Sequence, residues 1–118
     1  MERNIVSRIV EGCPKAFKAL VDYVITKSGA GQEWANEVLP MARKQELLML
    51  NTPAWHLYPF FDENDILVFP TPETPDRWCF NILATDYVPP VGKDVYPSRQ
   101  RAEEMGFLTA FLLLESRL

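Results

Sequence analysis

Hydrophobic residues recur at helical spacing in the first part of the chain, and this pattern predicts two helices. The first carries Ile5, Val6, Ile9 and Val10 and stops at "EGCP", where glycine and proline punctuate the pattern. The second begins at Pro14, because a first helical turn does not need the missing N–H, and ends at "KSGAG". Its apolar stripe consists of Phe17, Leu20, Val21, Val24 and Ile25.

Helical composition continues from Gln32 to about Asn51. Pro40 interrupts this stretch, and because proline lacks a donor and crowds the preceding turn, we expect a kink there or a break between two helices. The "NTP" that ends at Pro53 then stops helical structure.

Beyond Pro53 the hydrophobic period changes to two, which predicts β-strands. Arg77–Ala84 alternates well, and Ile66–Phe69 is a shorter β-type run. Ala54–Tyr58 is predicted as an outer strand, with Pro59 placing it at a sheet edge, and "DEND" as the turn that joins it to Ile66. The intervening "PTPETPD" is too rich in proline to pair, so it is predicted as a rigid loop. One face of the strand over 77–84 carries Trp78, Phe80, Ile82 and Ala84.

The chain closes with a helix predicted from about Ser98 to Ser116, with Ser98 as its N-cap. Its middle turns are hydrophobic on almost every side, and such a helix is normally buried on every side. Two arrangements meet that requirement. Either the helix lies centrally against the sheet with the N-terminal helices on its far side, or it is half buried in a second subunit.

These elements predict an α+β fold: N-terminal helices, a small antiparallel β-meander of two or three strands, and a long C-terminal helix packed on the sheet. We expect residues 1–118 to form a single domain, with a helical part over 1–51, the meander and loops over 52–97, and the last helix over 98–117. The ending has the general look of small proteins encoded by bacterial or phage genomes, without matching a particular family.

Composition narrows the possible functions. A chain of 118 residues that is 47% hydrophobic and 24% charged suits one globular domain, and its longest apolar run, over 107–114, is far short of the roughly 20 residues that span a bilayer. We therefore expect a cytoplasmic, unprocessed protein with no membrane partner. The 12 basic against 16 acidic residues argue against nucleic-acid binding, which needs clustered positive charge. Residues 51–76 carry five acidic side chains and no lysine or arginine.

The sequence contains no pattern typical of catalysis or of a bound cofactor. Cys13, Cys79 and His56 are too few and too far apart for a zinc site, so we expect reduced, buried thiols. The acidic turn "DENDILVF" fails the EF-hand pattern, and "TKSGAGQ" has the wrong order for a phosphate loop. A cysteine nucleophile with His56 as its base would need a spatial adjacency that spacing does not reveal. No metal or cofactor is predicted.

One local pattern suggests ligand contact. Arg99 and Arg101, with Lys93 and Tyr96 close by, lie at the start of the last helix, where free N–H groups favour anions. This predicts, as an alternative function, a small ligand-binding domain or enzyme that recognises an anionic group, with His56 as its base. The simpler interpretation is that the arginines pair with Glu103 or Glu104 at the surface.

The favoured prediction is a non-catalytic protein-interaction module that forms a homodimer through the C-terminal helix. The region from Ala54 to Phe80 holds more aromatic surface than the inner face of a thin sheet requires. Rings beside acids are typical of contact surfaces that select a basic partner. The equally weighted alternative is that helices cover both faces of the sheet. The predicted partner-binding residues are Trp55, Tyr58, Phe60, Phe61, Asp62, Glu63 and Asp65.

Overall fold

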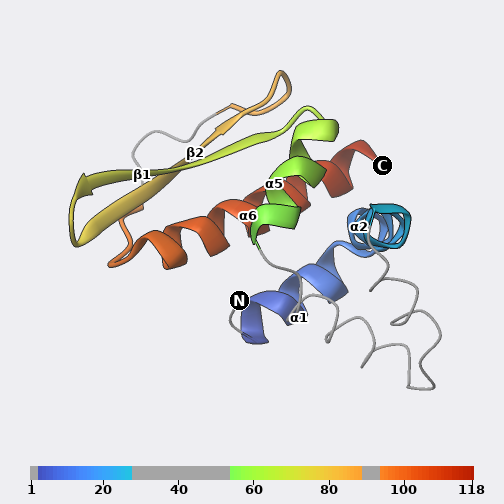
Figure 1. Cartoon of the computed structure of the whole chain (residues 1–118), viewed down its shortest axis with the longest axis horizontal. Coiled ribbons are helices and arrows are strands. Elements are labelled where there is room, and N and C mark those ends of the chain that lie inside the picture. Colours follow the sequence, from blue (N-terminus) through green and yellow to red (C-terminus); the bar gives the residue numbers. More distant parts are fainter. Residues whose placement is uncertain (1–2, 28–53, 89–93) are drawn as a thin grey trace.

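The computed structural model describes residues 3–27, 54–88 and 94–118, and its architecture is α+β, as the sequence predicts (Figure 1). In chain order the elements are α1 (Arg3–Gly12), α2 (Pro14–Lys27), α5 (Ala54–Glu63), β1 (Leu67–Thr74), β2 (Arg77–Leu83) and α6 (Arg99–Arg117). The two strands form one antiparallel sheet. The helical structure predicted over 32–51 lies outside the described residues.

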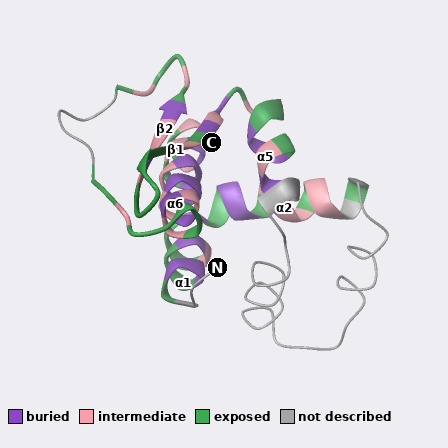
Figure 2. Ribbon diagram, turned by 60° about the vertical axis from the view of Figure 1, so that its left-hand side comes forward, coloured by how far each residue is buried: buried purple, intermediate pink, exposed green. Residues whose placement is uncertain are grey.

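Helix α6 is the central element of the fold. It packs against both strands on one side and against α1 and α2 on the other, so the sheet and these two helices lie on opposite sides of it in Figure 1. Figure 2 shows buried positions along almost its whole length. The first of the two predicted arrangements is therefore confirmed. The buried residues of α6 are Ala102, Glu104, Gly106, Phe107, Leu108, Ala110, Phe111 and Leu114.

The ends of α6 and α2 depend on capping by polar side chains. Ser98 is the N-cap of α6, as predicted, and its hydroxyl accepts a hydrogen bond from the N–H of Arg101 at 3.2 Å. The position before α2 is Cys13, whose buried side chain gives no such cap. A carboxylate from α6 replaces it: Oε1 of Glu115 accepts the N–H groups of Lys15 at 2.7 Å and Ala16 at 3.0 Å. This contact joins α2 to α6.

The strand predicted over Ala54–Tyr58 is wrong, because this segment belongs to helix α5. Leu57, Phe60 and Phe61 follow the i, i+3, i+4 spacing of one helical face, and all three are buried. Pro59 lies inside the helix and is exposed. Its missing backbone hydrogen bond costs free energy, but the burial of three large side chains outweighs that cost. The 52–97 part of the chain is therefore not only strands and loops.

Helix α5 ends in a Schellman motif at the predicted "DEND" turn. The N–H of Ile66 bonds to the carbonyl of Phe61 at 3.0 Å, and the N–H of Asp65 bonds to that of Asp62 at 3.1 Å. Asp65 takes the left-handed conformation that this motif requires, with φ of 59°. Ile66 and Phe61 are both buried, as is usual for the hydrophobic contact of the motif.

Strand β1 is longer than predicted, because it continues through Pro70 and Pro72 into the segment expected to be a loop. Trp78, opposite Pro72, exchanges its backbone hydrogen bonds with Tyr96 at 2.8 and 2.7 Å on the other edge of β2. The backbone of Pro72 therefore faces away from β2, and so does that of Pro70 two residues earlier. Prolines at these positions do not interrupt the pairing, because the edge strand needs no donor there.

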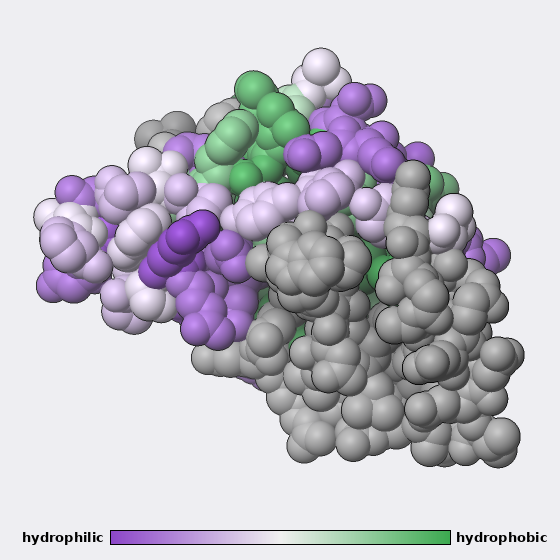
Figure 3. All heavy atoms as spheres, in the orientation of Figure 1, coloured by the Kyte–Doolittle hydropathy of each residue, from purple (hydrophilic) through white to green (hydrophobic). Residues whose placement is uncertain are grey.

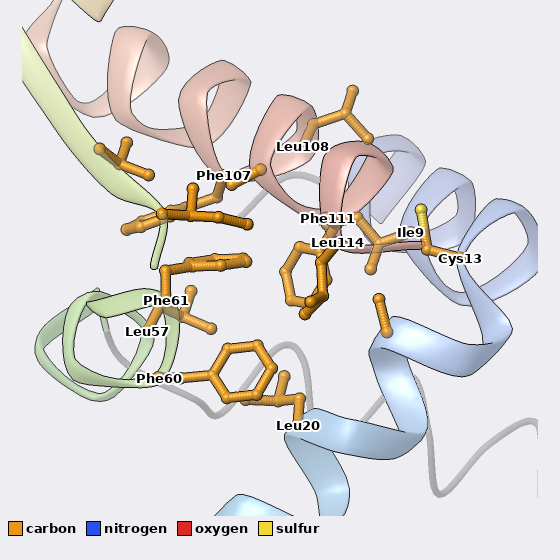
Figure 4. Packing of buried hydrophobic residues seen from close by; sticks show 14 of the residues in the cluster. Ile9, Cys13, Leu20, Leu57, Phe60, Phe61, Phe107, Leu108, Phe111 and Leu114 are labelled. Atoms are coloured by element: carbon orange, nitrogen blue, oxygen red, sulfur yellow. The ribbon is translucent and has the colours of Figure 1, made fainter. Parts of the chain in front are cut away.

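Aromatic rings fill the core where α5, α6 and α2 meet (Figure 4). Phe61 stacks on Phe107 with ring centroids 6.0 Å apart and meets Phe111 edge-on at 4.9 Å. Phe60 contacts Phe61 at 5.1 Å and reaches Tyr23 of α2 at 5.5 Å. These edge-to-face and offset contacts add to the free energy of burying the rings.

Candidate interaction surface

The aromatic residues predicted to bind a partner are mostly inside the molecule. Phe60 and Phe61 are buried, so the prediction that they lie at the surface is wrong: the helical turn of α5 directs them towards α6. Tyr58 is half-buried, and its hydroxyl donates a hydrogen bond to Oε2 of Glu103 at 2.8 Å. Burial, and then this hydrogen bond, raise the pKa of Tyr58, so its hydroxyl stays protonated. The side chain of Trp55 lies outside the described residues.

The predicted acidic residues lie at the end of α5. Asp62, Glu63 and Asp65 are exposed, and Glu63 lines a shallow depression of about 310 Å³ between α2 and α5 together with Asp22 and Tyr23. The pKa of Tyr23 is raised by burial and then by the negative charges of Glu63 and Asp62. Acids and aromatic rings thus meet across two helices, and not along a β-hairpin as predicted.

Two residues of the predicted anion site lie near each other: burial and then the charge of Asp94 raise the pKa of Tyr96, and the positive charge of Arg101 opposes that rise. Arg99 is exposed. Arg101 forms an ion pair with Glu104 at 3.6 Å, the partner that the simpler interpretation names, but Glu104 is buried and so the pair does not lie at the surface. Tyr96 bridges to β2, and its ring stacks on Phe80 at 6.2 Å. Lys93 and the side chain of His56 lie outside the described residues. Recognition of an anion here therefore stays a prediction.

Both cysteines lie inside the fold. Cys13 and Cys79 are free thiols, and both are buried, as predicted. Burial, and then the nearby charge of Glu115, raise the pKa of Cys13, which disfavours the reactive thiolate. Within residues 3–27, 54–88 and 94–118 there is no group of three or more His, Cys, Asp or Glu side chains that could hold a metal ion.

The two faces of the β-hairpin have different surroundings. Val68 and Ile82 are paired on the face that meets α6, and they are buried. Alternation places Leu67, Phe69 and Leu83 on the opposite face. There Phe69 is 45% exposed and Leu83 is 63% exposed, while Leu67 is partly exposed. These last three residues form what we call the outer patch, and Figure 3 shows hydrophobic side chains gathered over the sheet at the top of that view.

The sequence contains the signal for this patch, although the predicted surface was elsewhere. Leu67 and Phe69 alternate with Val68, and Leu83 alternates with Ile82. Period-two alternation separates two faces but does not tell which one a helix covers. That choice follows from the packing of α6, which only the tertiary structure shows.

Comparison of the chain with protein-family models, with curated proteins and with solved structures finds no match. Among the helices of the described residues, none is long and apolar enough to cross a membrane.

Proposed function

We propose that this chain is a non-catalytic protein-interaction module that binds a protein partner through the outer patch. The observation that carries the proposal is the exposure of Phe69 and Leu83 on a sheet whose other face packs against α6. Large apolar side chains that lie together at a surface mark contact sites more often than isolated ones do. An aromatic ring at the centre of such a patch is a common source of binding energy.

The charge on this face indicates the chemistry of the partner. Beside the outer patch, the outward side chains of Thr71 and Asn81 are uncharged and Cys79 is buried. The charged Arg77 lies at the far end of β2, where it pairs with Glu73 at 3.9 Å. A partner that placed a charge against this face would lose its hydration without an opposite charge to compensate. The partner surface is therefore apolar and uncharged. This replaces the basic partner that the acidic residues suggested from the sequence, since Asp62, Glu63 and Asp65 lie at the end of α5 and in the turn that follows it, and not on the outer face of the sheet.

A photo-crosslinking residue placed at Phe69 tests the proposal, and one placed at Leu118 is the matched control. Leu118 is 55% exposed, comparable to Phe69 at 45%, but lies at the end of α6. We expect one identifiable protein to be captured from position 69 and not from position 118. The purified form of that protein should then bind the wild-type chain in calorimetry. Equal capture from both positions, or a captured protein that does not bind when purified, would contradict the proposal.

A further inference from the structure

A second surface lies between α1 and α6, away from the sheet. It is an open groove of about 390 Å³, lined by Arg8, Glu11 and Gly12 of α1 and by Leu108 and Leu112 of α6. Leu108 forms its buried floor, and Leu112 projects from α6 and is 48% exposed. A Cβ added at Gly12 would meet no atom within 4 Å, so the space beside this residue is open.

Two side chains of opposite charge lie beside the leucines of the groove and do not pair with each other. Arg8 and Glu11 are both exposed, and neither forms a hydrogen bond or ion pair among residues 3–27, 54–88 and 94–118. They are three residues apart on α1, so they lie on one side of the helix, about one turn apart. The groove thus presents a positive and a negative group in a fixed order beside an exposed leucine.

From this arrangement we propose that the α1–α6 groove binds a second copy of this chain in a two-fold dimer. A two-fold axis perpendicular to α1 makes the two copies of that helix antiparallel. Arg8 of one copy then faces Glu11 of the other, and the same pair forms again on the other side of the axis. Leu112 of each copy packs against the other, over Leu108.

A second copy suits the groove better than a partner carrying one sign of charge. A uniformly basic partner would pair with Glu11 and repel Arg8, and an acidic partner would do the reverse. A second copy in antiparallel orientation pairs both groups at once. These two attractions offset part of the repulsion between two chains that each carry a net charge of −4. The contact is small, so we expect a weak dimer whose mass depends on concentration.

Light scattering over a concentration series tests this proposal on the full chain. We expect the wild-type mass to rise towards twice the chain mass, and Leu112→Glu to keep the mass of one chain. Leu118→Glu is the control, because Leu118 is 55% exposed at the end of α6 and does not line the groove. Its mass should follow the wild type. A wild-type chain that stays monomeric throughout the series would overturn the dimer.

Charge reversal tests the two-fold pairing even if Leu112→Glu fails to fold. Arg8→Glu and Glu11→Arg should each raise the dissociation constant by about tenfold, since each turns two attractions into repulsions. The double variant Arg8→Glu with Glu11→Arg restores opposite charges and should return the constant to within about threefold of the wild type. A dimer indifferent to the single reversals, or a double variant as weak as the singles, would overturn the pairing.

Discussion

The inner and outer faces of the β-hairpin consist of the same two strands but have opposite surroundings. Ile82 and Leu83 are neighbours in β2, similar in size and hydrophobicity, yet Ile82 is 7% exposed and Leu83 is 63% exposed. The difference lies in α6, which packs on one face only. A hydrophobic residue in a strand is therefore a core residue or a contact residue according to which helix covers it, and not according to its own chemistry.

One position in α6 allows the inner face to pack closely. A Cβ at Gly106 would lie 2.9 Å from Cγ1 of Val68 and 3.3 Å from Cβ of Phe80. The absence of a side chain therefore lets the helix backbone approach the sheet. No comparable element among the described residues covers Phe69 and Leu83, which is why those two side chains remain available for a partner.

The largest difference between the two faces of the sheet is expected when Ile82 and Leu83 are each truncated to alanine. Ile82→Ala should lower the free energy of unfolding by about 2–4 kcal/mol, because it removes buried methyl groups and leaves a cavity against α6. Leu83→Ala should change it by less than about 0.5 kcal/mol, because the side chain is mostly in water already. Urea denaturation of both variants measures the difference. Equal losses would mean that the outer face is covered as well.

A methyl group added at Gly106 tests the close approach of α6. Overpacking against Val68 costs about 1–3 kcal/mol, while alanine favours a helix over glycine by about 1 kcal/mol, so Gly106→Ala should lose about 1 kcal/mol net. Gly12→Ala is the matched control, because a Cβ there meets nothing within 4 Å. It should be neutral or slightly stabilising when measured in dilute solution. A stabilising Gly106→Ala would show that the sheet can move away from α6 at little cost.

A smaller effect on stability is expected from the ion pair between Asp86, which follows β2, and Arg117 at the end of α6. Nε of Arg117 donates to Oδ2 of Asp86 at 2.7 Å, and the guanidinium also bonds to Oδ1 of Asp86 and to the carbonyl of Asn64. The hydrogen bond from Arg117 lowers the pKa of Asp86 below its ordinary value of 3.8. The pKa of Asp86 is lower in the folded state than in the unfolded state. The ion pair therefore contributes fully to the free energy of unfolding above pH 3.8, and this contribution is lost as the pH falls through the folded-state pKa.

We therefore expect Asp86→Asn to be slightly less stable than the wild type at neutral pH. The gap should shrink as the pH falls below 3.8, where the wild-type carboxylate begins to be protonated. Thermal unfolding of both proteins over a pH series measures the gap. A difference that stays constant into strongly acidic solution would show that the ion pair does not stabilise the fold.

Much of the architecture could be predicted from hydrophobic periodicity. The helix after Pro14, the last helix with its Ser98 cap and the strand beginning at Arg77 all lie where their patterns predict them. Prolines caused two wrong predictions, the strand over Ala54–Tyr58 and the loop over 70–76. Pro59 suggested a strand edge but lies within a helix, and the prolines after Phe69 suggested a loop but fall on the side of β1 that needs no donor.

The candidate site was less predictable, because exposure depends on contacts between distant segments. Phe60 and Phe61 looked available next to the acids of α5, but they pack on α6, some 50 residues further along the chain. Phe69 looked like the last residue of a short strand, and only the position of α6 shows that its ring faces outward. Local pattern identifies apolar residues, whereas tertiary packing decides which of them a partner can reach.

The most direct test of the outer patch is calorimetric titration of the protein captured from position 69 into three forms of the chain: wild type, Phe69→Ser and Leu118→Ser. We predict that Phe69→Ser weakens binding by about tenfold or more while the chain stays folded, as expected for an aromatic residue central to a contact. Leu118→Ser, at an exposed leucine that lies at the end of α6 and outside both proposed contact surfaces, should bind like the wild type. Unchanged binding by a folded Phe69→Ser variant would contradict the assignment of the outer patch as the interaction surface.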